Sequence, residues 1–311
     1  MSFIRTKTIR GHDYLYIQES KRIGKGVYSR HVKYIGKGGH HKKAIREKDI
    51  STSIPQEKRK QLVTLIKLNR ILYSAEIEGV KIKHIKHAQD RIEERLGDTK
   101  SRHYNKETKQ YTPERQKLHE EIESKWVDKP GTEVPAGEQP TIILIGGTTA
   151  SGKTEVILSK IDQTKYVYLN ADDMQEKLPE YHKTNANTTH EEAGDMFDEA
   201  KNTALRQHKN IILDATLKNT EKAKAGIRLY KKLGYKVILY GTQKTPENAA
   251  KQAVIRAIIK HRIVPNEYIL EHTETINKSV RELAIESDEY HIYDTNIMGG
   301  KLISEGVNNE K

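Results

Sequence analysis

Cysteine is absent from the 311-residue sequence, and several kinds of chemistry are excluded with it. Without a thiol the chain can form no disulfide, no thiolate metal site and no cysteine nucleophile. The composition therefore suits the reducing environment of the cytosol.

Long apolar runs are absent as well. No stretch approaches the ~20 apolar residues of a membrane-spanning helix. The first residues, Met1 to Lys7, lack the apolar segment of a secretory signal. We therefore expect a soluble, cytoplasmic protein with no membrane partner. A length of 311 residues suggests about two domains and is ample for a sizeable core.

Positive charge is concentrated in the first part of the chain. Residues 1–130 contain 31 Lys/Arg and 17 Asp/Glu, a net charge of +14, whereas residues 131–311 contain 24 and 26, a net charge of −2. The two values sum to the formal net charge of +12. Such asymmetry indicates an acidic partner for residues 1–100, of which nucleic acid is the commonest.

A phosphate-binding loop is the strongest motif of the sequence. Ile142 to Ile145 are consecutive apolar residues and predict a buried parallel strand, and residues 147–154 then fit the pattern G-x-x-x-x-G-K-[ST] without mismatch. In this pattern the glycines let backbone N–H groups point at phosphates, the lysine reaches the β/γ-phosphates and the last hydroxyl can bind Mg²⁺. A helix over 152–160 would direct its positive end at the anion. The predicted site consists of Gly147, Thr148, Thr149, Ala150, Ser151, Gly152, Lys153 and Thr154, with Thr154 as the Mg²⁺ ligand.

Strands and helices alternate after this loop. Further strands are predicted at 165–171, 210–215, 236–241 and 289–293, with helices between them. This order is typical of an α/β fold in which helices flank a parallel sheet and ligands bind at the carboxyl ends of the strands. We assign residues 111–300 to a P-loop kinase-type domain, and residues 98–110 to a polar linker before it.

Two smaller regions precede that domain. Residues 1–43 predict a basic antiparallel β module, in which tyrosines alternate with lysines or arginines. These residues would form either a nucleic-acid-binding surface, or a small core of tyrosines with the cations on a solvated face. This module resembles the short β-rich N-terminal module of some transposase-like proteins. Residues 44–100 predict a helical region, with an apolar stripe within 62–72. Residues 74–79 resemble the inhibitory-helix motif of Fic-type proteins, so Glu78 is either regulatory or a solvated residue before a helix cap at Gly79.

Acidic residues lie at the predicted ends of two strands, and arginines lie in a segment that could cover the site as a lid. Asp172 and Asp173 follow the second strand, and Asp214 ends the third, as in sites that orient Mg²⁺ and its water. Arg256 and Arg262 lie late in the helix after the fourth strand, where a cationic lid could neutralise charge on a transferred phosphoryl group. Helix capping by the two aspartates and solvent exposure of the arginines are the alternatives.

An ordered set of motifs resembles the zeta-toxin family of P-loop kinases. Besides the phosphate-binding loop, the matching segments are Tyr111–Ile122, Leu169–Met174, Leu178–Tyr181, Asn210–Lys218, Leu233–Tyr235, Arg256, Arg262–Pro265 and Tyr293–Asp294. The resemblance implies ATP-dependent transfer of the γ-phosphate to a substrate hydroxyl, with UDP-activated amino sugars as the substrate class. It also implies an antitoxin protein as a possible partner.

The resemblance also implies roles for individual residues. Asp172 would accept the hydroxyl proton, Lys153 and Thr154 would hold phosphate and Mg²⁺, and Arg256 and Arg262 would clamp the phosphates. The substrate side would be formed by Asp173, Glu199 (or its neighbour Asp198), Asp214, Thr216 and Lys218. Four positions depart from the family, which commonly has Pro-Gly at Thr149-Ala150, Glu at Asp214 and Arg at Lys218.

Three functions remain open at this stage. The first is a kinase of zeta-toxin type that acts on a small molecule. The second is a kinase acting on RNA, DNA or nucleotide ends, which residues 1–100 would deliver. The third is a non-catalytic nucleic-acid-binding protein whose conformation ATP sets.

Overall fold

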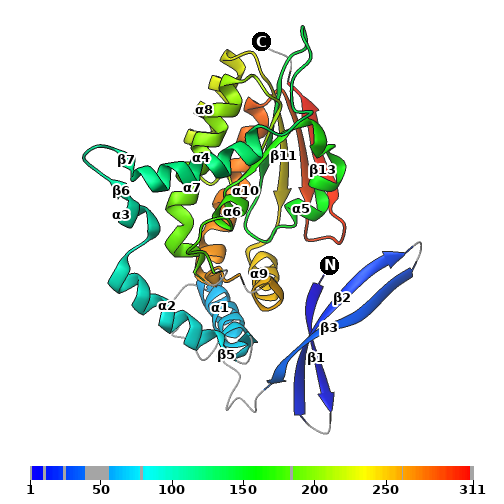
Figure 1. The fold of residues 1–311 in the computed structure, drawn as a ribbon. Coiled ribbons are helices and arrows are strands. Elements are labelled where there is room, and N and C mark those ends of the chain that lie inside the picture. The colour runs from blue at the N-terminus through cyan, green and yellow to red at the C-terminus, as the bar shows by residue number, and fades with distance from the viewer. Residues whose placement is uncertain are drawn as a thin grey trace. The chain divides into compact units, whose positions relative to one another are not determined.

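The computed structural model describes residues 2–9, 12–23, 26–38, 56–77, 80–182, 185–260 and 262–308 (Figure 1). The chain divides into two compact units. Unit 1 comprises Met1–Ala88 and Thr245–Thr273, and unit 2 comprises Gln89–Lys244 and Glu274–Lys311. Within the described residues, no helix is both long and apolar enough to cross a membrane.

Unit 1 combines a three-stranded antiparallel sheet with helices. The strands, in the order β1-β2-β3, confirm the β module predicted for this region. In α1, Leu68 and Leu72 of the predicted apolar stripe are buried. The short antiparallel strands β4 and β5 interrupt the predicted helical region. Glu78 and Gly79 lie outside the described residues. The elements are β1 Ser2–Ile9, β2 His12–Ile23, β3 Gly26–Gly38, α1 Gln56–Ser74, β4 Glu76–Ile77, β5 Val80–Lys81, α2 Ile82–Leu96 (its first part), α9 Pro246–Lys260 and the first turns of α10 Asn266–Glu286.

Unit 2 is built on a six-stranded sheet in the order β13-β12-β11-β8-β10-β9. Five strands are parallel, and only the edge strand β13 runs antiparallel to its neighbour β12. The predicted parallel sheet of a P-loop kinase-type fold is thereby confirmed. The strands are β8 Thr141–Gly146, β9 Val167–Asn170, β10 Ile211–Asp214, β11 Lys236–Gln243, β12 Glu289–Asp294 and β13 Lys301–Val307.

Alternate residues of the central strand enter two different cores. Ile142 and Leu144 of β8 pack in one cluster with residues of the helices α4 (Pro113–Val127), α7 (Ala186–Arg206), α8 (Thr220–Lys232) and α10. Ile143 and Ile145 pack in a second cluster with residues 156–158, which follow the loop. Because successive side chains of a strand point to opposite faces, a strand covered on both faces is apolar at every position. This explains the unbroken apolar run in the sequence.

Two local predictions were wrong. The helix expected over 152–160 stops early: α5 spans only Lys153–Val156, and a 3-10 helix, Leu158–Lys160, follows. Residues 98–110 are an ordered element and not a linker. They form the helix α3, Thr99–His103, and a hairpin of β6, Tyr104–Asn105, with β7, Gln110–Tyr111. Lys100 of this element pairs with Asp195 of α7, although Asn105 to Gln110 are exposed, and composition alone does not reveal such a contact.

Helix α10 provides a matched test of the larger core of unit 2. Leu283 is fully buried, whereas Ile285, two residues further along, is 77% exposed. We expect Leu283→Ala to lower the free energy of unfolding by about 2–5 kcal/mol, and Ile285→Ala to change it by less than about 0.5 kcal/mol. Urea titration followed by circular dichroism measures both, and equal effects of the two changes would contradict this core.

Candidate active site

The loop between β8 and α5 has a backbone shape that depends on small residues. Gly147 has φ 149° and Gly152 has φ 87°. A Cβ atom at Gly147 would lie 1.9 Å from Oγ1 of Thr242 and 3.0 Å from Oγ of Ser151. These two hydroxyls also hydrogen-bond to each other at 2.7 Å, which fixes the loop against the end of β11. Gly147 therefore has both a conformational and a steric reason to lack a side chain.

Lys153 folds back across the same loop. Its Nζ donates to the carbonyl oxygen of Gly147 at 2.9 Å and lies 3.8 Å from Oδ1 of Asp214. The next residue, Thr154, is exposed at the start of α5. A cation held inside a curved backbone, with an accessible hydroxyl beside it, matches what phosphate and Mg²⁺ require. The residues of the loop thus fit a nucleoside triphosphate and its metal ion.

Asp214 connects the loop to the neighbouring strands. It ends β10, and its carboxylate is buried. Oδ2 accepts hydrogen bonds from the hydroxyl of Tyr168 at 3.0 Å and from Nδ2 of Asn170 at 3.2 Å. Burial first, and then the charge of Asp214, raises the pKa of Tyr168, so the phenol keeps its proton and donates.

Asn170 continues this chain of contacts to the candidate base. Its Oδ1 accepts from the backbone N–H of Asp172 at 2.8 Å and so caps α6, Ala171–Gln175. One amide side chain therefore binds both Asp214 and the first turn of the helix that carries Asp172 and Asp173. The structure thus joins Lys153, Asp214 and the backbone at Asp172 through consecutive polar contacts.

The other predicted substrate-side residues lie on α7 and after β10. Glu199 accepts from Nε2 of Gln116 at 3.3 Å, and Asp198 pairs with Lys201 and Lys222. Thr216 is half-buried and Lys218 exposed. The segment around them is anchored by the hydroxyl of Ser279, which donates to the carbonyl oxygen of Leu217 at 2.6 Å.

Both arginines of the predicted lid belong to unit 1. Arg256 lies in α9, and Arg262 lies between α9 and α10. Their roles, like those of the substrate-side residues, stay predictions.

Sequence reasoning gave no role to three residues near the strand ends, although one of them, Asn170, belongs to the predicted strand-end cluster with Asp172 and Asp173. Tyr168 and Asn170 are two positions apart on β9, and this spacing places them on one face of the strand, which was the available signal. Lys244 follows β11 and is only 6% exposed, and this burial lowers its pKa despite the opposing charges of Glu155 and Asp294. Nothing in the local sequence distinguishes Lys244 from a solvated turn residue.

Comparison with known protein families identifies one that this chain matches. Residues 125–298 match the sequence model of the family described as zeta toxin, which is more than half of the chain. The chain belongs to the zeta toxin family. The family predicted from the ordered motifs is therefore confirmed.

Individual relatives of this zeta toxin family member are distant. Toxin PezT of Streptococcus pneumoniae serotype 4 is 27% identical over 169 residues, which cover 48% of this chain and 67% of PezT. A structure from the PezAT chromosomal toxin-antitoxin system of the same pathogen is 24% identical, with a TM-score of 0.48, over 63% of this chain and 81% of the other. A structure of AvrRxo1-ORF1:AvrRxo1-ORF2 with sulphate ions is 20% identical, with a TM-score of 0.49, over 64% and 71%.

Gly147 offers a direct test of the loop. We expect Gly147→Ala to weaken ATP binding by at least about tenfold, because the new methyl group forces the loop away from Thr242, and such overpacking costs ~1–3 kcal/mol. Isothermal titration with ATP measures the loss. Gly194→Ala is the control, because a Cβ there has nothing within 4 Å. Unchanged affinity in Gly147→Ala would show that the loop does not hold the nucleotide.

Proposed function

We propose that this protein is an ATP-dependent phosphotransferase that transfers the γ-phosphate to a hydroxyl group of a small substrate. The observation that carries the proposal is the continuous path from Lys153 through Asp214 and Asn170 to the backbone of Asp172. Such a path fixes a phosphate-binding cation and a carboxylate-bearing helix relative to each other, and positioning is the main contribution of proteins to phosphoryl transfer.

The proposed step assigns one task to each residue. The loop N–H groups and Lys153 hold the phosphates, and Thr154 ligates Mg²⁺, which neutralises phosphate charge when bound. The Asp172 carboxylate accepts the proton of the substrate hydroxyl as its oxygen forms a bond to the γ-phosphorus. The bond from that phosphorus to the bridging oxygen breaks, and ADP leaves. Arg256 and Arg262 would clamp the phosphates in this step.

The acceptor that we propose is a UDP-activated amino sugar. Membership of the zeta toxin family supports this choice, and Asp173, Glu199, Asp214, Thr216 and Lys218 would form the substrate side. Asp214 is bound to Lys153, Tyr168 and Asn170. It would therefore contribute to substrate binding by holding these partners in place, and not through direct contact with the substrate alone.

Family membership also suggests a biological setting. PezT is named a toxin, and the PezAT structure is described as a toxin-antitoxin system. We propose that the present protein is likewise toxic, acts in the cytoplasm and is held inactive by an antitoxin protein.

Asp172→Asn separates chemistry from binding. We expect this change to lower the rate of phosphate transfer by about 10²–10⁴-fold, because an amide cannot accept the proton, while ATP affinity stays unchanged. Transfer of labelled γ-phosphate to UDP-N-acetylglucosamine, total RNA and short DNA measures the rate, with Lys153→Ala as the blank. Loss of transfer and of ATP binding together would contradict the assignment of Asp172 as the base.

The runner-up is a kinase that acts on nucleic acid. The basic surplus of residues 1–130 favours it, and so does the register of the N-terminal sheet, where Tyr16 lies opposite Arg5 of β1 and Tyr34 of β3. Aromatic and cationic residues at neighbouring positions are typical of single-strand-binding sheets.

Salt dependence distinguishes the two substrates. If residues 1–100 bind a polymer, the logarithm of RNA affinity should fall with the logarithm of salt concentration by about 0.7 per phosphate contacted. Fluorescence anisotropy with a labelled oligonucleotide between 50 and 200 mM salt, a range of about fourfold, measures the slope. A shallow slope would remove support for the runner-up. RNA binding without any phosphorylated product would instead indicate the non-catalytic switch.

A further inference from the structure

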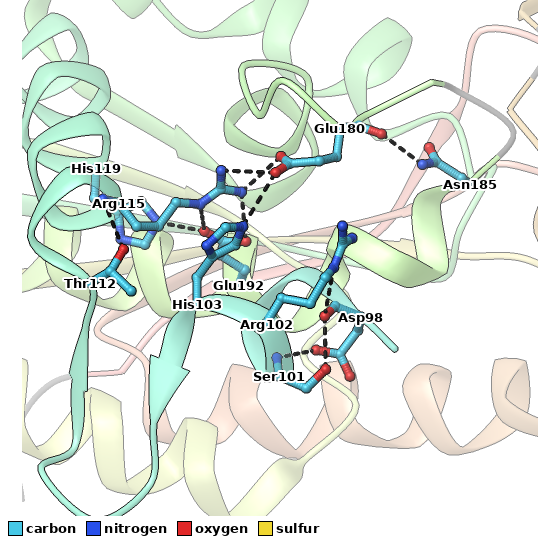
Figure 2. Close-up of polar contacts among 10 residues, drawn as sticks. All are labelled: Asp98, Ser101, Arg102, His103, Thr112, Arg115, His119, Glu180, Asn185 and Glu192. Atoms are coloured by element: carbon cyan, nitrogen blue, oxygen red, sulfur yellow. Dashed lines mark hydrogen bonds and ion pairs between the residues drawn. The ribbon is translucent and has the colours of Figure 1, made fainter. Parts of the chain in front are cut away.

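The segment that precedes the family match is bonded to α7 and to the stretch that follows α6. The zeta toxin match begins at residue 125, yet α3, the β6–β7 hairpin and the start of α4 lie before it. Figure 2 shows side chains from this segment converging with Glu180 and Glu192. Glu180 lies in the stretch after α6, the helix that begins with the candidate base, and Glu192 lies on α7.

Arg115 of α4 is the centre of this network. Its guanidinium binds both carboxylates with four donor contacts (Figure 2). Nη1 and Nη2 donate to the two oxygens of Glu180 at 3.1 and 2.9 Å, while Nε and Nη2 donate to the two oxygens of Glu192. Only a planar guanidinium can serve two carboxylates in this way, because the ammonium group of lysine is a single point charge.

Two histidines complete the contacts with the glutamates. Nε2 of His119 lies 2.7 Å from Oε1 of Glu192, and Nε2 of His103 lies 3.4 Å from Oε1 of Glu180. Burial alone would raise the pKa of Glu192, but hydrogen bonds from His119 and Arg115 outweigh it and lower the pKa to about 2. Because this value lies below the ordinary 4.5, the ionised carboxylate contributes stability that is lost as the pH falls toward 2.

A second anchor lies further along α7. Asp195 accepts a hydrogen bond from the hydroxyl of Tyr111 at 2.6 Å, and its other oxygen accepts from Nζ of Lys100 at 2.9 Å. The ring of Tyr111 also contacts His119 edge-on, with centroids 4.5 Å apart. The segment 98–115 is thus attached to α7 at Glu192 and Asp195, independently of its single contact region at Glu180.

Glu180 itself lies in a folded turn. The backbone N–H of Tyr181 donates to the carbonyl oxygen of Leu178, and Nδ2 of Asn185 donates to that of Glu180 at 2.7 Å. Leu178 is buried in the larger core. A contact that holds the Glu180 carboxylate therefore holds the whole stretch 176–182, which continues directly from Asp172 and Asp173.

We propose that Arg115 is a positioning residue for phosphate transfer, which acts through Glu180 to hold residues 176–182 and the preceding helix α6 in the arrangement that receives the acceptor. The inference rests on the proposed kinase function. β9 is an edge strand of the sheet, and β10 separates it from β8 and the phosphate-binding loop. The stretch after β9 and α6 therefore lies at the carboxyl edge of the sheet but away from that loop, where an acceptor rather than the nucleotide would bind. Residues 98–115, which include Arg115, would therefore help to position the acceptor.

Glu180→Gln is the informative change. Glu180 is 27% exposed as a side chain, whereas Glu192 is fully buried, so the change loosens the tether and leaves the buried Arg115–Glu192 pair intact. Glu120→Gln is the matched control, because Glu120 is an exposed carboxylate on α4, outside the stretch that receives the acceptor. Arg115→Lys, which keeps the charge but loses the fork, is the second variant.

Steady-state kinetics with UDP-N-acetylglucosamine and ATP, together with hydrogen–deuterium exchange over residues 176–182, tests the inference. In Glu180→Gln and Arg115→Lys we expect the KM for the sugar nucleotide to rise about tenfold, since small misplacements near a site are costly. The KM for ATP should not change, and exchange over 176–182 should be faster. Glu120→Gln should match the unaltered protein in all three.

Other outcomes overturn one idea or the other. Equal changes in both KM values, or no difference between Glu180→Gln and Glu120→Gln, would reduce Arg115 to a general stabilising residue. Failure of the unaltered protein to phosphorylate any of the acceptors tried would overturn the proposed function instead. In that case hydrogen–deuterium exchange would still show whether the contact between Arg115 and Glu180 holds residues 176–182. Faster exchange confined to Glu180→Gln and Arg115→Lys supports this role of the contact, and equal exchange in every variant refutes it.

Discussion

The carboxylate of Asp214 is buried at the end of β10, and the geometry of the candidate site depends on how its charge is satisfied. An ion removed from water is costly unless cations and hydrogen-bond donors replace the lost solvent. Here Lys153 supplies the opposite charge, and Tyr168 and Asn170 supply donors. Because these partners lie on α5 and β9, the loop after β8 and the helix after β9 are both held next to the end of β10.

A second buried carboxylate follows the same physical rule beside the site. Glu192 has no exposed surface, and Arg115 and His119 satisfy it from α4. Asp214 binds residues that lie on or directly after neighbouring strands of one sheet. Glu192 instead attaches α7 to α4, which lies some 70 residues earlier in the chain. Both cases use buried charge to specify one arrangement, since any other pairing would leave a carboxylate in a dry environment without a partner.

The N-terminal region forms one compact unit with part of the region that matches the zeta toxin family. Residues 245–273, which fall inside the zeta toxin match, form a compact unit with Met1–Ala88 rather than with the sheet. Within that unit Asn69 of α1 bonds to Asn266 and Glu267 at the start of α10. The basic N-terminal region therefore shares a folded unit with α9, the helix that carries Arg256, and α1 and β1 of that region contact α9.

The sequence by itself determined the phosphate-binding loop, the parallel strands and the family, because each is encoded locally: glycines at fixed spacing, apolar runs of strand length, and motifs in a fixed order. It did not reveal the ordered hairpin at 104–111, the edge strand β13 or the partners of Asp214 and Arg115. These depend on pairing between residues far apart in the chain. Arg115 and Glu192 are separated by 77 positions, and only the fold decides that their charges meet out of water.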